Sequence, residues 1–167
     1  MCNKLFRRPG APDGSGNMTA MKNSTGVRDG TLAFTWQVRV YYEDTDAGGV
    51  VFYANYLKFF ERARTEWLRA AGIEQQRLVD ERGIGFVVRR TEVEYLSPAR
   101  LDDVLRIETR VAETRRCQVV FEQTAWRGEQ RLARGSIQVV CIDMSAFRPM
   151  ALPAEVAALF GADNGLS

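Results

Sequence analysis

The sequence contains no histidine. This absence excludes a Ser-His-Asp triad, because that arrangement needs an imidazole to take the proton from serine. It also argues against a zinc enzyme, since the three cysteines (Cys2, Cys117 and Cys141) are widely spaced and form no CxxC pair. We therefore expect no bound metal and no cofactor, and any acid or base chemistry has to come from other side chains.

Long hydrophobic runs are also absent. Charged residues interrupt every apolar stretch before it reaches the roughly 18 to 20 residues that a membrane-spanning helix needs. The first thirty residues have no continuous apolar core of the kind found in secretory signals. With 46% apolar and 26% charged residues, the composition is that of a globular domain. We expect a soluble, cytoplasmic protein.

The positive charge is confined to the N-terminal segment. Residues 1–34 contain five basic and two acidic residues, which leaves 18 basic and 19 acidic residues for the rest of the chain. Because these basic residues form no patch with interleaved aromatic residues, a solvated arm is favoured over a contact with nucleic acid. We predict a flexible tail at 1–34, one domain at 35–161 and a C-terminal tail at 162–167, with no nucleic-acid partner.

Hydrophobic periodicity predicts a strand followed by two helices. Residues 36–42 alternate in the period of two that is typical of a half-buried strand. Within residues 54–71 apolar side chains recur every three or four positions, which predicts a long helix with an aromatic-rich face. Gly72 is well placed for the left-handed residue beyond its end. A shorter helix is predicted over 74–81.

The second half of the chain reads as strands. Four stretches, GFVVRRTEVEYL, VLRIETRVAET, CQVVFEQTAWR and QRLARGSIQVVCID, are separated by turn residues, which predicts three consecutive antiparallel connections. A short helix is expected over 154–160. One apolar helix against one antiparallel sheet buries both hydrophobic faces, which gives an α+β fold. The sheet must have edges, and pairing with a second copy would satisfy one of them, so we expect at least a dimer.

An acidic run, VYYEDTDAGGVVFYANY, begins at Val40 and joins the first strand to the long helix. Its glycines, Gly48 and Gly49, let the backbone bend sharply and approach a ligand closely. The unpaired amides of the following helix N-terminus can stabilise an oxyanion. Asp46 can then act as a nucleophile or as a general base toward water. Helix capping is the competing interpretation of these acids, worth about 1 kcal/mol each.

The stretch YEDTDAGGVVFYANYLKFFERARTEWL closely resembles the signature of the 4-hydroxybenzoyl-CoA thioesterase branch of the hotdog-fold superfamily, and in particular the Tol-Pal-associated acyl-CoA thioesterases. The resemblance continues through RGIGFVVRRTEVEYLSPARLDDVLRIET and VVCIDMSAFRPMALP, and so covers residues 38–160. It implies a five-stranded antiparallel sheet wrapped around one long central helix. It also implies active sites shared across a dimer interface and, frequently, a homotetramer.

The resemblance implies an acyl-CoA thioesterase, a hydrolase that releases a free acid and coenzyme A. The family's catalytic carboxylate corresponds to Asp46, and its oxyanion donor corresponds to the backbone amide of Tyr53. Many Tol-Pal-associated members have histidine at this position, so here no imidazole assists Asp46, and the local pattern is closer to the 4-hydroxybenzoyl-CoA enzymes. Tyr42 matches a tyrosine beside the active carboxylate, although a core position in the strand explains it equally well.

Substrate contacts follow from the same motif. Gly48, Gly49 and Val50 are expected to lie against the substrate. Coenzyme A carries three phosphate groups, which require basic side chains near the mouth of the cleft. Arg100 is our candidate for this role, and Arg89 or Arg90 are further candidates. For each of them, a solvated position on the surface is the competing interpretation.

The long helix carries further candidates. Glu61 lies about one turn past the active loop, and a related hotdog branch uses a helix glutamate as its base. An i, i+3 pair with Arg64 explains Glu61 more simply. We also expect Phe59, Phe60 and Trp67 to pack across a dimer interface and to set the depth of the acyl pocket, so the sequence does not choose among short, long and aromatic acyl groups.

Two other functions compete with hydrolysis. A hotdog hydratase or dehydratase relies on a histidine in the members that perform this reaction, and the chain has none. A non-catalytic module that holds acyl-CoA or acyl-carrier protein near the cell-envelope machinery is the second alternative, motivated by the missing histidine. The expected partners are an acyl-CoA substrate, further copies of the chain and, as an additional candidate, acyl-carrier protein.

Overall fold

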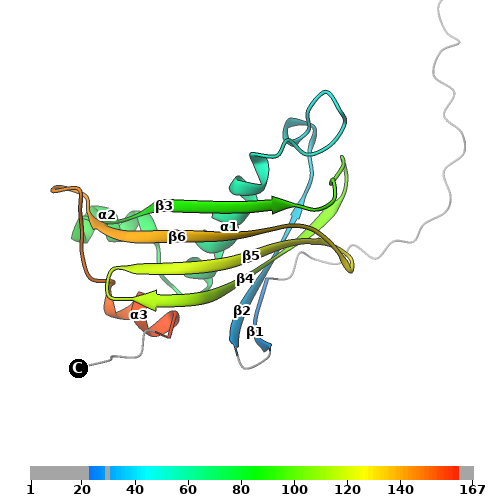
Figure 1. The fold of residues 1–167 in the computed structure, drawn as a ribbon. Helices are drawn as coiled ribbons and strands as arrows, with labels where there is room; N and C mark the ends of the chain where they lie inside the picture. Colours follow the sequence, from blue (N-terminus) through cyan, green and yellow to red (C-terminus); the bar gives the residue numbers. More distant parts are fainter. Residues whose placement is uncertain (1–22, 29–30, 162–167) are drawn as a thin grey trace, which may run out of the picture.

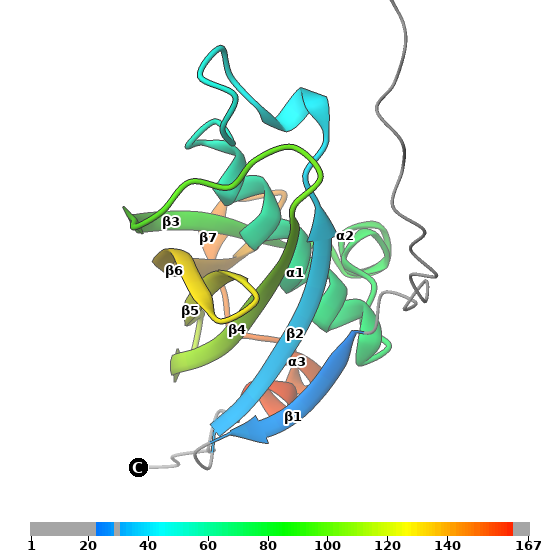
Figure 2. The same ribbon diagram turned by 90° about the vertical axis from the view of Figure 1, so that its right-hand side faces the viewer.

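A single antiparallel sheet curves around one long helix (Figures 1 and 2). The structure is a computed structural model that describes residues 23–28 and 31–161. Its strands are β1 (Ser24–Arg28), β2 (Thr31–Arg39), β3 (Ile84–Tyr95), β4 (Val104–Arg115), β5 (Gln118–Arg127), β6 (Gln130–Asp143) and β7 (Arg148–Pro149). Its helices are the 3₁₀ turn η1 (Tyr42–Asp44) and the α-helices α1 (Asn55–Ala70), α2 (Gln75–Arg82) and α3 (Ala154–Leu159).

The strand order within the described residues is β1-β2-β4-β5-β6-β3, with β7 paired to the end of β6. Of the seven strands, the five long ones correspond to the predicted five-stranded sheet, and β1 and β7 are short additions. In register, Trp36 of β2 lies opposite Ile107 of β4, and Val87 of β3 lies opposite Val140 of β6.

One of the three predicted hairpin connections is wrong. The β4-β5 and β5-β6 hairpins form, but β3 pairs with β6 and not with β4. After β3 the chain crosses the end of the sheet in the loop 96–103 and returns beside β2 (Figure 2). This crossover leaves β3 at one edge of the sheet, with β1 at the other.

Strand structure begins earlier than the predicted domain boundary between residues 34 and 35. Strand β1 and the first residues of β2 lie inside the segment that the sequence analysis assigned to the tail. The sequence of β1, STGVR, has one large apolar residue, so hydrophobic periodicity gives no signal, and main-chain pairing with β2 defines this strand. The remaining parts of the predicted tails, residues 1–22, 29–30 and 162–167, lie outside the described residues.

Both predicted central helices are confirmed, within one residue at each end. Gly72 has a φ of 78°, and the amide of Ile73 donates to Leu68 O at 2.9 Å, which closes α1 in the manner of a Schellman motif. Gly83 ends α2 in the same left-handed region, with a φ of 63°. No helix in the described part of the chain combines the length and the hydropathy that crossing a membrane requires.

The aromatic face of α1 forms the centre of the core. Phe59, Phe60 and Trp67 are fully buried within the single chain, so the expectation that they pack across a dimer interface is wrong. Trp67 stacks on Phe34 of β2, with ring centroids 5.8 Å apart. Phe60 packs so closely on Gly135 of β6 that a Cβ there would lie 3.1 Å from its ring. Burial of each such side chain contributes about 1.5 to 3 kcal/mol.

Candidate active site

The acidic run folds back on itself between η1 and α1. Thr45 and Val51 form an isolated antiparallel bridge, and the amide of Asp46 donates to Val50 O at 2.9 Å. The amide of Val51 also donates to Ala99 O at 2.8 Å, in the loop between β3 and β4. Main-chain hydrogen bonds therefore hold the loop, and the side chains at its tip are left available.

Asp46 lies at this tip and is exposed. Its Oδ1 accepts the amide of Gly48 at 2.8 Å, and its carbonyl accepts the amide of Gly49 at 2.9 Å. Gly49 has a φ of 70°, a conformation that residues with a side chain rarely adopt. A Cβ on Gly48 would lie 3.0 Å from Asp46 Oδ1. The turn thus orients the carboxylate, while Oδ2 accepts no hydrogen bond from any residue that the structure describes.

Asp44 has a different, structural role. It is buried, and its Oδ2 accepts the amide of Tyr41 at 2.8 Å, which caps η1. Its carbonyl accepts both the amide of Phe52 and the side-chain amide of Asn55, each at 2.9 Å. Asp44 thus caps η1, a turn that the sequence analysis did not predict, and not the long helix to which the capping interpretation referred. That interpretation does not hold for α1, because the residue at the N-cap, Ala54, has no side-chain capping bond.

The N-terminus of α1 presents free amides next to this loop. Tyr53 and Ala54 form the turn that leads into the helix, and Ala54 already has helical backbone angles. Within the described ranges, the amides of Tyr53 and Ala54 donate to no protein acceptor. A helix N-terminus carries a partial positive charge. The site can therefore stabilise an anion beside Tyr53 without help from a side chain.

A cavity of about 290 Å³ opens beside Tyr53. It is lined by Val51, Tyr53, Tyr56, Tyr95 and the loop residues 96–98. The Tyr53 ring is 60% exposed and meets the edge of the Tyr95 ring, with centroids 6.1 Å apart. Tyr56 is buried, which raises the pKa of its hydroxyl, and its oxygen accepts the amide of the neighbouring loop at 3.3 Å. Burial also raises the pKa of the Tyr95 hydroxyl, so both of these hydroxyls keep their protons at physiological pH.

The structure brings several of the predicted site residues together. Asp46, Gly48, Gly49 and Val50 form one turn. Arg100 is exposed and directly follows Ala99, whose carbonyl accepts the amide of Val51. Arg100 therefore lies in the loop that contacts this turn. Its own amide donates to a neighbouring carboxylate at 2.8 Å.

Tyr42 lies outside the strand in which one of the two sequence interpretations placed it. Strand β2 ends at Arg39, and Tyr42 begins η1 with its side chain 81% exposed. The alternative in which it fills the core of the strand is therefore wrong. Its carbonyl accepts the amide and the hydroxyl of Thr45, at 3.1 and 2.9 Å, which ties it to the acidic loop through the backbone.

The remaining charged candidates make other contacts. Arg89 and Arg90 are exposed on the edge strand β3, and Arg90 pairs with Glu92. The predicted i, i+3 pair of Glu61 with Arg64 is present only as an attraction between charges. The hydrogen bonds of the two side chains go elsewhere, since Glu61 accepts the hydroxyl of Thr65 at 2.7 Å and Arg64 donates to Gln123 at 2.6 Å. Among the described residues there is no group of three His, Cys, Asp or Glu side chains able to hold a metal ion.

Sequence reasoning missed two buried polar residues. Asn55 anchors the loop through Asp44, and Gln123 accepts from Arg64 beneath the long helix. The alternation of apolar residues in β5 could have indicated that Gln123 is buried. Gln123 lies on the same inward face of the strand as Phe121 and Ala125. A polar side chain at a core position of an alternating strand indicates a buried hydrogen-bonded group.

The chain matches the family described as the thioesterase-like superfamily over residues 40–160. It is 47% identical over 127 residues to the acyl-CoA thioesterase YbgC of Haemophilus influenzae, covering 76% of this chain and 93% of that protein. It is 50% identical over 131 residues to the acyl-CoA thioester hydrolase YbgC of Escherichia coli O6:H1, covering 78% and 97%. A crystal structure of 4-hydroxybenzoyl CoA thioesterase with 4-hydroxybenzoyl CoA aligns with a TM-score of 0.70 at 28% identity, covering 77% and 98%.

The turn geometry makes different predictions for its two glycines. Gly49→Ala should lower the free energy of unfolding by about 1 kcal/mol or more, because alanine is strained at positive φ. Gly48→Ala is the matched control. Its new methyl group meets only the movable end of Asp46, so its effect should stay within about 0.5 kcal/mol. Urea unfolding measures both, and equal losses would contradict the assignment of strain to Gly49.

Proposed function

The chain belongs to the thioesterase-like superfamily as an acyl-CoA thioesterase with the hotdog fold, and we propose that Asp46 and the backbone amide of Tyr53 carry out its reaction. The observation that carries the proposal is that one folded segment holds both an oriented, exposed carboxylate and, in the turn just before α1, the two amides of Tyr53 and Ala54, which donate to no residue that the structure describes. Hydrolysis adds water across the thioester and yields a free acid and coenzyme A.

Asp46 supplies the attack on the acyl carbon. Its Oδ1 is held by the amide of Gly48, which leaves Oδ2 to bond the acyl carbon directly or to take a proton from an attacking water. In the covalent route the carbon-sulfur bond breaks as an anhydride with Asp46 forms, and water then hydrolyses this anhydride to the free acid and the regenerated carboxylate. In the general-base route the water oxygen bonds the acyl carbon and the carbon-sulfur bond breaks directly. In both routes the sulfur of coenzyme A leaves and takes up a proton. No imidazole is needed, which suits a chain without histidine.

The amide of Tyr53 stabilises the oxygen that becomes negative during the attack. A preorganised backbone donor performs this role without rearrangement, and the positive end of α1 adds to it. Because the donor is main-chain, tyrosine or histidine at this position serves equally well as a source of the N–H group.

The remaining predicted residues position the substrate. Gly48, Gly49 and Val50 form the turn against which the thioester lies, and the exposed Arg100 meets a phosphate of coenzyme A. Tyr42, exposed at the start of η1, is joined to the acidic loop by its carbonyl, which accepts from Thr45, and in the proposal it faces the substrate from there. The bond from the Val51 amide to Ala99 O, which holds the loop of Arg100 against this turn, supports the placement of Arg100.

Asp46→Asn should lower turnover by about a hundredfold to ten-thousandfold, because the amide neither attacks the carbon nor accepts a proton from water. Thiol release from short-chain, long-chain and aromatic acyl-CoAs measures this effect and also identifies the preferred acyl group. Glu43→Gln, an exposed acid three residues away, is the control and should retain activity. Near wild-type turnover by Asp46→Asn would refute the assignment, and saturable binding by the wild type without thiol release would favour a binding module.

Tyr53→Pro should lower kcat by about a hundredfold to a thousandfold, since proline has no N–H to donate to the oxyanion. Tyr53→Ala keeps the amide and should stay within a few-fold of the wild type. Circular dichroism and urea unfolding establish that both variants are folded. If the alanine variant loses as much activity as the proline variant, the donor is not the amide.

The proposal includes self-association along β3. This edge strand pairs with β6 on one side and with no other strand that the structure describes, and its Val88 side chain is 52% exposed. Sedimentation should show a dimer or a tetramer for the wild type. Val88→Lys should shift the protein toward the monomer, because a charge on an edge strand opposes pairing. Val104→Lys, at an exposed position of β4, is the control. A monomeric wild type would contradict the proposal.

A further inference from the structure

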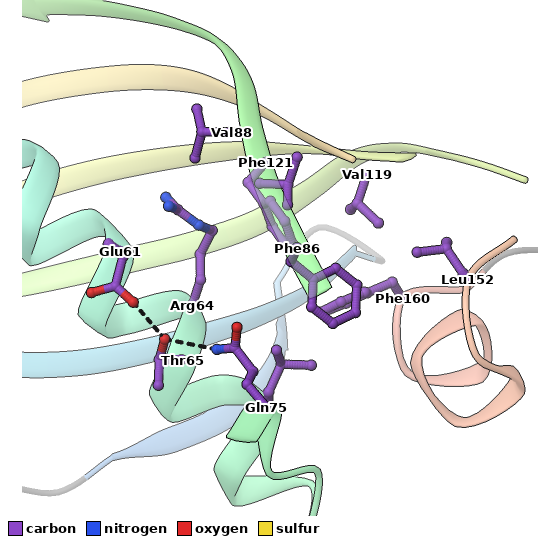
Figure 3. A pocket seen from close by; sticks show the side chains of 12 residues that line it. Glu61, Arg64, Thr65, Gln75, Phe86, Val88, Val119, Phe121, Leu152 and Phe160 are labelled. Atoms are coloured by element: carbon purple, nitrogen blue, oxygen red, sulfur yellow. Dashed lines mark hydrogen bonds between the residues drawn. The ribbon is translucent and has the colours of Figure 1, made fainter. Parts of the chain in front are cut away.

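A second cavity, of about 110 Å³, lies beside the middle and the C-terminal half of α1, between α1, β3, β5 and the C-terminal segment (Figure 3). We call it the helix cavity. Its wall is mostly apolar and includes the rings of Phe86, Phe121 and Phe160. Of the residues that line it, only Glu61 and Val88 are exposed, so they mark its mouth.

Arg64 places a positive charge in this apolar wall. Its Nη1 donates to Gln123 Oε1 at 2.6 Å, and its guanidinium lies 6.0 Å from the centre of the Phe121 ring. Arginine has five N–H donors, and the others have no acceptor among the residues that the structure describes. Burial lowers the pKa of Arg64 to about 10, with the attraction of Glu61 acting in the opposite direction.

Glu61 does not form a hydrogen bond with this cation. Its Oε1 accepts the hydroxyl of Thr65, which in turn accepts the side-chain amide of Gln75 at 2.9 Å (Figure 3). The carboxylate is therefore engaged along the helix, away from the guanidinium. Arg64 is partly buried, and a cation that is partly withdrawn from water without a hydrogen-bonded anion carries a cost that an incoming anion would offset.

Gln123 keeps Arg64 in this position. Gln123 is 1% exposed, and its Nε2 donates to Phe60 O at 2.9 Å and to Thr109 Oγ1 at 2.8 Å. Because both donors of the amide are used, its oxygen must face the guanidinium. The arginine is thus oriented by a buried polar network before any ligand arrives.

One face of α1 connects the proposed reaction centre to the helix cavity. Tyr53, Leu57 and Glu61 are spaced four residues apart, so they follow one another along the helix, and all three are exposed. Eight residues of helix correspond to about 12 Å along the axis. Pairing of a second copy along β3, where Val88 lies, would cover this face and shield it from water.

We propose that the helix cavity binds the far end of the acyl group and that Arg64 selects acyl groups that end in a carboxylate. This inference rests on the proposed function. The planar guanidinium matches a carboxylate with two parallel hydrogen bonds, whereas a terminal methyl group leaves its donors unsatisfied. The apolar wall suits the methylene groups that precede the carboxylate.

The test compares acyl-CoAs of equal length that end in a methyl group or in a carboxylate, over a series of lengths. For chains long enough to reach the mouth, the wild type should show a kcat/KM about tenfold or more higher for the carboxylate member. Arg64→Met, similar in size and uncharged, should bring this ratio close to one. Arg64→Lys should retain part of the preference. Arg69→Met, an exposed arginine on the same helix, is the control and should leave the ratio unchanged.

Calorimetric binding separates this inference from the proposed function. In the Asp46→Asn background the substrates persist, so affinity can be measured without turnover. Carboxylate-ended acyl-CoA should bind more tightly than its methyl-ended partner, and Arg64→Met should remove the difference. Equal affinities and equal kcat/KM values in the wild type would overturn the selection by Arg64 and leave the role of Asp46 intact. A wild-type kcat/KM that favours the carboxylate member, together with full turnover by Asp46→Asn, would overturn only the role of Asp46.

Discussion

The burial of one aromatic helix face against a curved sheet determines where the reaction centre lies. Phe59, Phe60 and Trp67 leave α1 little freedom to rotate or slide, because each fits between side chains or against a glycine of the sheet. The first turn of α1 is therefore held at the end of the sheet. The turn of Tyr53 and Ala54, whose amides are unpaired among the described residues, directly precedes it and is held in place with it.

The loop beside this helix is built mainly from backbone contacts. The bridge of Thr45 with Val51 and the bond from Val51 to Ala99 do not depend on side-chain identity. Asn55 adds one side-chain anchor to the carbonyl of Asp44. These backbone hydrogen bonds position Asp46 and the amide of residue 53. The proposed chemistry is therefore compatible with a tyrosine at position 53.

Much of the fold was predictable from periodicity, whereas contacts between distant segments were not. The spacing of apolar residues in 54–71 and the glycine at 72 predicted α1 closely. The place of β3 at the sheet edge depends on the crossover of the loop 96–103, which no local pattern encodes.

The motif predicted that Asp46 belongs to a turn with its glycines. The network of Arg64 with Gln123 joins residues 59 positions apart, and helical spacing favoured the nearer Glu61 instead.

The pairing of β2 with β4 also affects how the chain assembles as it is made. Trp36 of β2 lies opposite Ile107 of β4. When β2 leaves the ribosome, dozens of residues must therefore still be added before its partner strand is made. Between these two strands come both central helices and β3, whose own partner β6 is made later still. The sheet therefore closes only after β6 has been made, and until then the newborn chain exposes apolar strands that are prone to aggregation.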